Sequence, residues 1–243
     1  MNCIFVQITG RLGNQLFQIA LGYSISQKTN KNFAMVYNNN NYYEQEYIPY
    51  FYDITFIPKE RVPTCTVYSE KNSTVNCFKF NPEIINEGFF DGYFQSWKYF
   101  IDYLPDLKNI FLKNNITKTD GYFIHVRRGD YVNHPVYQID YEQYFKKAIQ
   151  HFPKDSKFYI VSDNIPFCEN CSLFNNGSFS FVDLDTISTL HFMAGCRGGI
   201  CANSSFSWWG ALLGRREIVT MPKQWINNGM DTSEIHFPGV IVI

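Results

Sequence analysis

The stretch from Tyr122 to Tyr131, which reads Tyr-Phe-Ile-His-Val-Arg-Arg-Gly-Asp-Tyr, constrains the fold of this chain more than any other. Its apolar start is typical of a strand buried in a sheet, and two adjacent arginines follow it directly. A buried strand that ends in charged groups delivers them to a ligand at its carboxyl end. We therefore predict an α/β protein in which a strand over residues 121–127 leads to a ligand site.

The two arginines of this stretch are predicted to have different roles. Alternation along a strand places His125 and Arg127 on one face and Arg128 on the other. The planar five-donor fork of an arginine suits a phosphate or a carboxylate. Arg127 is therefore the candidate anion-binding residue, and Arg128 is expected to pair with Asp130. The alternative, that both arginines make structural ion pairs only, stays open on these residues alone.

Composition narrows the class of protein. The chain has 243 residues, of which 45% are hydrophobic and 18% aromatic, so it can bury a core without disulfides. A formal charge of -1 gives no basic field for nucleic acid and no polybasic membrane anchor. The first ten residues read as neither a signal peptide nor a spanning helix. Seven scattered cysteines fit free thiols in a reducing compartment. We expect a cytoplasmic protein without nucleic-acid partners or a membrane anchor.

The first half of the chain begins with a strand over residues 3–9, a glycine turn at residues 10–13 and a helix that continues to about Tyr23. Such a turn either brings backbone donors close to a ligand or is only a tight connection. A second strand is predicted over residues 33–37 and a helix over 101–112, whereas residues 42–80 show no clear period. A polar stretch over residues 113–120 indicates a boundary between domains 1–117 and 118–243.

The second half repeats a strand-helix pattern, which predicts a parallel sheet with ligand groups at the ends of its strands. A glycine pair, Gly198-Gly199, is expected to stop a helix over residues 186–196, and a strand is predicted over residues 200–202. The remaining predicted elements are helices over 141–152 and 203–213 and strands over 157–161, 179–182 and 217–221. Asn203, Ser204 or Ser205 can cap the helix that follows residue 202 and leave its free N–H groups aimed at the ligand edge.

Two further motifs have alternative interpretations. Asp183 and Asp185 follow a strand, where an Asp-x-Asp pair can hold a divalent metal against a diphosphate. We favour the alternative, in which one aspartate caps a helix and the other is solvated. Cys168 and Cys171 have the spacing of half a zinc site or a redox pair, but no second pair accompanies them, so we expect two ordinary thiols.

Four segments carry a resemblance to a known family. With them the chain resembles the family 11 glycosyltransferases, the α-1,2-fucosyltransferases that use GDP-L-fucose. The segments follow the family's order and span residues 10–18 (Gly-Arg-Leu-Gly-Asn-Gln-Leu-Phe-Gln), 92–100 (Gly-Tyr-Phe-Gln-Ser-Trp-Lys-Tyr-Phe), 125–131 (His-Val-Arg-Arg-Gly-Asp-Tyr) and 202–209 (Ala-Asn-Ser-Ser-Phe-Ser-Trp-Trp).

The resemblance implies a GT-B-like α/β fold, in which two Rossmann-like domains face a cleft and the amino-terminal one is reduced. It implies an inverting transferase without metal or other cofactor, with GDP-L-fucose as donor substrate and a galactose-containing glycan as acceptor, at O2 of a terminal β-galactoside. It places Arg127 on the β-phosphate of the donor, with Ser204 and Ser205 on the phosphates as well. His125 and Asp163 are candidates for the guanine or ribose, and Asn14 for a place near the fucose and the incoming hydroxyl.

The expected site is therefore as follows. The catalytic candidates are Arg127, Asn14 and Asp130, and the donor-binding candidates are Arg11, Gly13, His125, Arg128, Asp163, Asn203, Ser204, Ser205 and Phe206. Two other functions stay open: a metal-dependent nucleotide-sugar transferase that uses Asp183 and Asp185, and a non-catalytic module that binds a nucleotide or a glycan.

Overall fold

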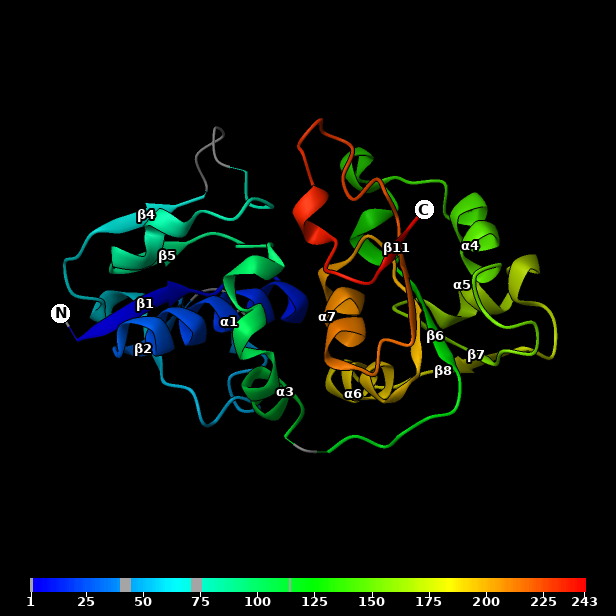
Figure 1. The fold of residues 1–243 in the computed structure, drawn as a ribbon, viewed down its shortest axis with the longest axis horizontal. Coiled ribbons are helices and arrows are strands. Elements are labelled where there is room, and N and C mark those ends of the chain that lie inside the picture. The colour runs from blue at the N-terminus through cyan, green and yellow to red at the C-terminus, as the bar shows by residue number, and fades with distance from the viewer. Residues whose placement is uncertain (1, 40–44, 71–75, 114) are drawn as a thin grey trace. The chain divides into compact units, whose positions relative to one another are not determined.

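The computed structural model describes residues 2–39, 45–70, 76–113 and 115–243 (Figure 1). The chain divides into two compact units: unit 1 is Met1–Asn114 with Ser233–Ile235, and unit 2 is Asn115–Thr232 with His236–Ile243. The division after residue 114 lies close to the predicted boundary after residue 117. The return of Ser233–Ile235 to unit 1 is not apparent from the sequence.

The side chain of Glu234 explains why this short segment belongs to unit 1. Its carboxylate accepts hydrogen bonds from Phe80 N (2.8 Å) and Ser96 Oγ (2.9 Å), and it pairs with Lys98 Nζ (2.9 Å). All three donors belong to unit 1. Because these contacts join residues about 140 positions apart, no local sequence pattern reveals them.

Unit 1 contains a five-stranded parallel sheet in the order β3-β2-β1-β5-β4. Its strands are β1 (Cys3–Gln7), β2 (Asn32–Tyr37), β3 (Phe56–Pro58), β4 (Val67–Ser69) and β5 (Phe89–Asp91), and its helices are α1 (Leu12–Thr29) and α3 (Leu104–Leu112). Central β1 is almost entirely buried, and α1 packs against β1 and β2. The predicted strand-turn-helix start and the second strand are therefore confirmed.

Two local features of unit 1 differ from the predictions. The helix predicted over residues 101–112 begins at Leu104, because Pro105 suits a first helical turn and residues 101–103 form a separate 3-10 turn. The stretch over residues 42–80 contains β3 and β4, which are three residues long and lie at the sheet edges. Strands this short show no measurable period. Residues 40–44 and 71–75 of that stretch lie outside the described residues.

Unit 2 contains a six-stranded parallel sheet in the order β11-β10-β9-β6-β7-β8. Its strands are β6 (Tyr122–Val126), β7 (Phe158–Ser162), β8 (Phe179–Val182), β9 (Gly198–Ile200), β10 (Ile218–Met221) and β11 (Ile241–Val242), and its helices are α4 (Tyr141–Ile149), α5 (Ile165–Glu169), α6 (Thr186–Gly195) and α7 (Ser205–Leu213). Every residue of β6 is buried between β7 and β9. This confirms the buried strand predicted from its apolar run.

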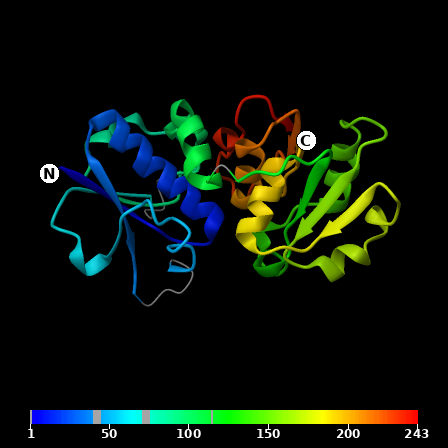
Figure 2. The same ribbon diagram turned by 90° about the horizontal axis from the view of Figure 1, so that it is seen from below.

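Helices cover both faces of this sheet. Helices α4 and α5 lie on one face and α6 and α7 on the other, as both ribbon views show (Figures 1 and 2). The chain moves from β6 outward to β8, returns through α6 to β9 beside β6, and then moves outward in the opposite direction. Right-handed crossovers place the helices of two opposite directions on opposite faces. The strand order therefore reverses between β6 and β9.

The role of the glycine pair Gly198-Gly199 was predicted wrongly. Gly198 and Gly199 form the first two positions of the strand instead of a helix stop, and the strand ends at Ile200. A Cβ atom on Gly199 would lie 2.5 Å from Phe123 O, and one on Gly198 would lie 2.1 Å from Ile218 O. Glycine is thus required here by the close approach of β6 and β10.

The seven cysteines are free thiols, as predicted. Cys168 is buried against the core of unit 2, with Cys171 packed beside it. Across the described ranges, no helix is both long and apolar enough to cross a bilayer.

Candidate active site

The reversal of strand order in unit 2 gathers the predicted ligand groups. In open parallel sheets, ligands bind at the carboxyl ends of the strands where the order reverses. Arg127 and Arg128 follow β6 directly, and Ser204 and Ser205 lie after β9, at the start of α7. Because β6 and β9 are hydrogen-bonded neighbours, these two segments share one edge of the sheet.

Arg127 is held by two carboxylates at this edge. Its Nη1 donates to Asp163 Oδ2 at 2.6 Å, and its Nη2 pairs with Asp130. The side chain is only 12% exposed, and its guanidinium lies 5.2 Å from the centre of the Tyr131 ring. These carboxylates use two of the five N–H groups of Arg127, so three N–H groups remain for an anion.

The prediction of an ion pair between Arg128 and Asp130 is wrong, because Asp130 pairs with Arg127. The strand ends at Val126, and a 3-10 turn over Gly129–Tyr131 follows it, so strand alternation no longer applies. This turn brings Asp130 back to Arg127. The guanidinium of Arg128 instead stacks 3.8 Å from the centre of the Phe167 ring, and its buried Nε has no hydrogen-bond partner among the described residues.

Asp163 connects β7 to the same edge. It follows β7 directly, and its Oδ1 accepts a hydrogen bond from the backbone N–H of Arg128 at 2.8 Å. One carboxylate therefore fixes both the side chain of Arg127 and the backbone of Arg128. Phe167, which the sequence did not single out, comes from α5 just beyond Asp163.

His125 is buried on β6 with its ring 5.7 Å from that of Phe206. Its Nδ1 is buried and has no partner within the described part of the chain. Burial, together with the charge of Arg127, lowers the pKa of His125 to about 3. The imidazole is therefore neutral at physiological pH and can act only through hydrogen bonds or ring packing.

The amino terminus of α7 is capped by Ser204. Its Oγ accepts a hydrogen bond from Phe206 N at 3.4 Å, and Ser205 is the first residue of the helix. Free N–H groups and the helix dipole favour an anion at this position. Trp208 and Trp209 are fully buried one turn later and fix the helix in the unit 2 core.

Asn203 is 1% exposed, and hydrogen bonds with three residues occupy its side-chain amide. Its Nδ2 donates to Tyr137 O (3.1 Å) and Trp225 O (2.9 Å), and its Oδ1 accepts from the hydroxyl of Tyr141. These bonds tie the start of α7 to α4 and to the segment after β10. The amide thus holds the start of α7 in place.

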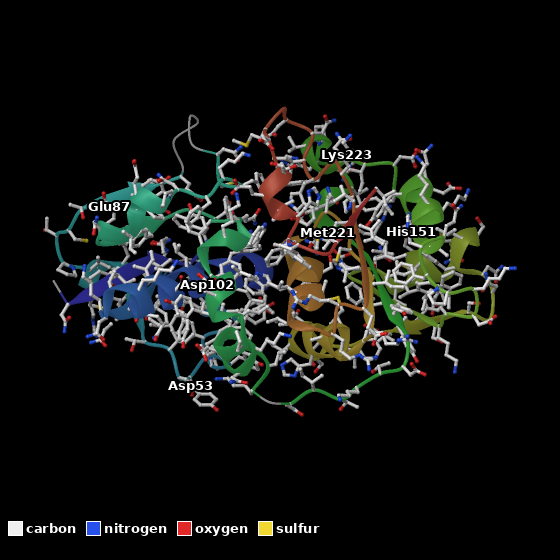
Figure 3. The ribbon with its side chains drawn as sticks, in the orientation of Figure 1. Asp53, Glu87, Asp102, His151, Met221 and Lys223 are labelled. Carbon is white, nitrogen blue, oxygen red and sulfur yellow. The ribbon has the colours of Figure 1, made fainter. Side chains whose placement is uncertain are left out.

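A cavity of about 590 Å³ in unit 2 adjoins these loops. Side chains of α4, including Gln143 and Lys147, form one wall, and the segment after β10 forms another. Figure 3 labels Lys223, which belongs to this second wall, and Met221, the last residue of β10, which precedes it. Asn203 therefore connects the wall of the cavity to the start of α7 through Trp225 O.

One aspartate of the Asp-x-Asp motif, Asp185, has a structural role. Asp185 caps α6 and accepts from Ser188 N at 3.0 Å and from the hydroxyl of the same serine. These bonds hold the pKa of Asp185 below its usual value. Among the described residues, no group of three His, Cys, Asp or Glu side chains is placed to hold a metal ion.

The three remaining predicted residues belong to unit 1, where β1 lies between β2 and β5 in the sheet. Arg11 is the exposed N-cap residue of α1, Gly13 is buried in the first turn of the helix, and Asn14 follows it. The Oδ1 of Asn14 accepts a hydrogen bond from Gln95 Nε2 at 2.8 Å. The segments after β1 and β5 thus meet at the carboxyl edge of this sheet, just as those after β6 and β9 do in unit 2.

Comparison with solved structures identifies the fold. Fucosyltransferase NodZ from Bradyrhizobium aligns with a TM-score of 0.51 and 12% identity, covering 88% of this chain and 92% of NodZ. The E. coli heptosyltransferase WaaC aligns with a TM-score of 0.55 and 9% identity, covering 99% of this chain and 92% of WaaC. The two parallel sheets are those of a GT-B glycosyltransferase, as expected.

Sequence comparison gives the family. Residues 68–237 match glycosyl transferase family 11, and the chain belongs to this family. It is 25% identical to an alpha-1,2-colitosyltransferase of Escherichia coli over 93% of each chain. It is also 30% identical to the O-antigen biosynthesis glycosyltransferase WbnK of Escherichia coli, over 42% of this chain and 38% of WbnK. The resemblance carried by the four segments is therefore confirmed.

Proposed function

We propose that this glycosyltransferase moves L-fucose from GDP-L-fucose to a glycan hydroxyl, O2 of a terminal β-galactoside, with inversion at the sugar carbon. The observation that carries the proposal is that Arg127 and the amino terminus of α7 follow two neighbouring strands, β6 and β9, at one edge of the sheet. A diphosphate needs two such groups of donors. Family membership and the GDP-fucose named for the soaked NodZ crystal support a GDP-sugar as the donor.

Each group at the unit 2 edge has a proposed role. Arg127 and the serines at the start of α7 stabilise the diphosphate as its charge grows in the transition state, a contribution of about 3 kcal/mol per preorganised donor. His125, which is neutral, contacts the guanosine part of the donor, and Asp163 contacts it as well. Asp130 and Asp163 also orient the fork of Arg127 through their ion pairs.

Removal of the proton from the acceptor hydroxyl needs fewer protein groups than stabilisation of the diphosphate does. When a sugar passes through an oxocarbenium-like state, the acceptor hydroxyl loses its proton late, so a strong base is unnecessary. We place Asn14 of unit 1 next to the transferred sugar and the incoming hydroxyl, where its amide orients the nucleophile. Arg11 and Gly13, which precede it, complete the donor contacts from the glycine turn.

The relative named as an alpha-1,2-colitosyltransferase favours a second donor, GDP-colitose, because it aligns with nearly the whole chain. Colitose is L-fucose without its 3-hydroxyl group. A site built to hydrogen-bond that hydroxyl discriminates strongly against the deoxy sugar, whereas an apolar site hardly discriminates. Initial rates with the two donors on one β-galactoside acceptor distinguish them.

A thermal-shift comparison of GDP, UDP and CMP tests the donor class. A nucleotide at 100 times its dissociation constant raises the unfolding free energy by about 2.7 kcal/mol. We expect GDP to stabilise the protein and UDP and CMP to leave it unchanged. Stabilisation by UDP without stabilisation by GDP would refute the proposed donor.

A further inference from the structure

A buried carboxylate that the proposed mechanism does not use lies at the carboxyl edge of unit 1. Glu70 follows β4 directly and is 7% exposed. None of the described Lys, Arg or His side chains pairs with it, and its Oε1 is buried without a hydrogen-bond partner there. Its Oε2 accepts from two consecutive backbone groups, Tyr93 N and Phe94 N, at 2.8 Å each. The carboxylate is thus committed to the turn after β5.

That turn has an unusual backbone. Phe94 has a φ of 51°, in the left-handed region that residues with side chains rarely adopt. Its ring is fully buried and packs against the rings of Phe90 and Tyr99, which fixes one side of the turn. The bonds to Glu70 fix the other side. Gly92 leaves the room they need, since a Cβ atom there would lie 2.5 Å from Glu70 Oε2.

This turn also positions a residue of the proposed site, Asn14. Gln95 follows Phe94, is 8% exposed, and donates from Nε2 to Asn14 Oδ1 at 2.8 Å. On the other side of the turn, Gln18 Nε2 of α1 donates to Gly92 O at 2.8 Å. A connected path therefore runs from Glu70 through the Gly92–Gln95 turn to Asn14.

We propose that Glu70 is a positioning residue for transfer: its carboxylate holds the Gly92–Gln95 turn so that Gln95 orients the amide of Asn14 at the carboxyl edge of unit 1. The inference rests on the proposed function for the role of Asn14. Glu70 acts as an acceptor of backbone hydrogen bonds, not as a base, because its reachable oxygen already serves two N–H groups. Burial raises the pKa of Glu70 to about 7, with the two backbone bonds lowering it, and the neutral acid still accepts both bonds.

Two variants of Glu70 separate this role from others. Glu70→Gln keeps an acceptor oxygen, so it should keep kcat/KM for the acceptor within about threefold of wild type, whereas Glu70→Ala should lower it by about 10- to 100-fold, as a misplacement near 1 Å does. GDP affinity, a property proposed for unit 2, should not change in either. A third variant, Gln95→Leu, keeps Glu70 and removes the bond to Asn14, and it should reproduce the loss.

The possible outcomes are distinct. An inactive but folded Glu70→Gln would make Glu70 a base and overturn the proposal, as would a Glu70→Ala or a Gln95→Leu enzyme with unchanged kcat/KM. Amide hydrogen exchange adds a readout that needs no substrate. The N–H groups of Tyr93 and Phe94 should be protected in wild type and Glu70→Gln and exchange faster in Glu70→Ala; equal protection in all three would also overturn it. A wild type that rejects GDP-sugars would refute the proposed function but leave this exchange test intact.

Discussion

His125 lies on β6 and Arg127 follows the strand two positions later, and the protein uses the two residues in opposite ways. Arg127 forms ion pairs with Asp130 and Asp163, which fix its side chain. His125 is buried and has no carboxylate partner among the residues that the structure describes, so it stays neutral. A site with one fixed cation next to one neutral ring can separate the phosphate of a nucleotide from its base or ribose.

The lowered pKa of His125 predicts a measurable pH dependence. Because its pKa falls from 6.5 to about 3 on folding, its contribution to stability is complete above pH 6.5 and is lost as the pH falls towards 3, by up to about 1.4 kcal/mol per pH unit. Glutamine does not titrate. The difference in unfolding free energy between wild type and His125→Gln, measured with urea at pH 7.5, 6 and 5, should change at that slope below pH 6.5. Parallel pH profiles would show that the imidazole is not buried as described.

At the carboxyl edge of the unit 2 sheet, the sequence predicts the roles of some residues better than those of others. The order of types in His-Val-Arg-Arg-Gly-Asp predicts an anion site, because charge after an apolar run has few other uses. It does not predict which arginine Asp130 contacts, because that depends on a turn beyond Val126. Phe167 lies under Arg128 only because β7 is the neighbour of β6, which no local pattern specifies.

At the level of elements, the start of α7 is predicted better than the strand before it. A run of small hydroxyl residues followed by an apolar run has one common explanation, a capped buried helix. The short strand β9 contains two glycines, and local rules assign glycine to turns. Only the contact of Gly199 with Phe123 across the sheet explains why a strand needs glycine there.

Two helix caps allow a matched comparison. Ser204 caps α7 at the proposed donor edge, and Asp185 caps α6. Replacing either by alanine should lower the unfolding free energy by about 1 kcal/mol. Only Ser204→Ala should also weaken GDP binding, by at least about tenfold for a hydrogen bond to a charged group. Equal GDP affinity in the two variants, measured by calorimetry, would remove α7 from the donor site.

The whole chain carries a formal charge of -1, so positive charge for a diphosphate must be local. Each unit has one parallel sheet in which two neighbouring strands, β1 and β5 in unit 1 and β6 and β9 in unit 2, bring polar groups from segments distant in sequence to one carboxyl edge. The repeated strand-helix pattern predicts the parallel sheets. The return of Ser233–Ile235 to unit 1 depends on long-range contacts, such as those of Glu234, and has no such pattern.

Metal independence follows from this local charge. If Arg127 and α7 neutralise the leaving diphosphate, a chelator should leave the initial rate of fucosyl transfer within about twofold of the untreated rate. Asp185→Asn should likewise keep its activity, because the aspartate caps α6. A rate that collapses with chelator and returns with manganese would favour the metal-dependent alternative built on Asp183 and Asp185.

The affinity of Arg127 variants for GDP tests the central claim most directly. Lysine keeps the charge but not the fork, so Arg127→Lys and Arg127→Ala should both weaken GDP binding, by about 100-fold, on the scale of one preorganised donor. Arg197 is a matched control, because it too is ion-paired, to Glu217 at 2.8 Å, and stacks 5.2 Å from a tyrosine ring centre, that of Tyr122. Arg197→Lys should bind GDP like wild type. A folded Arg127→Lys protein that binds GDP within about threefold of wild type would contradict the account.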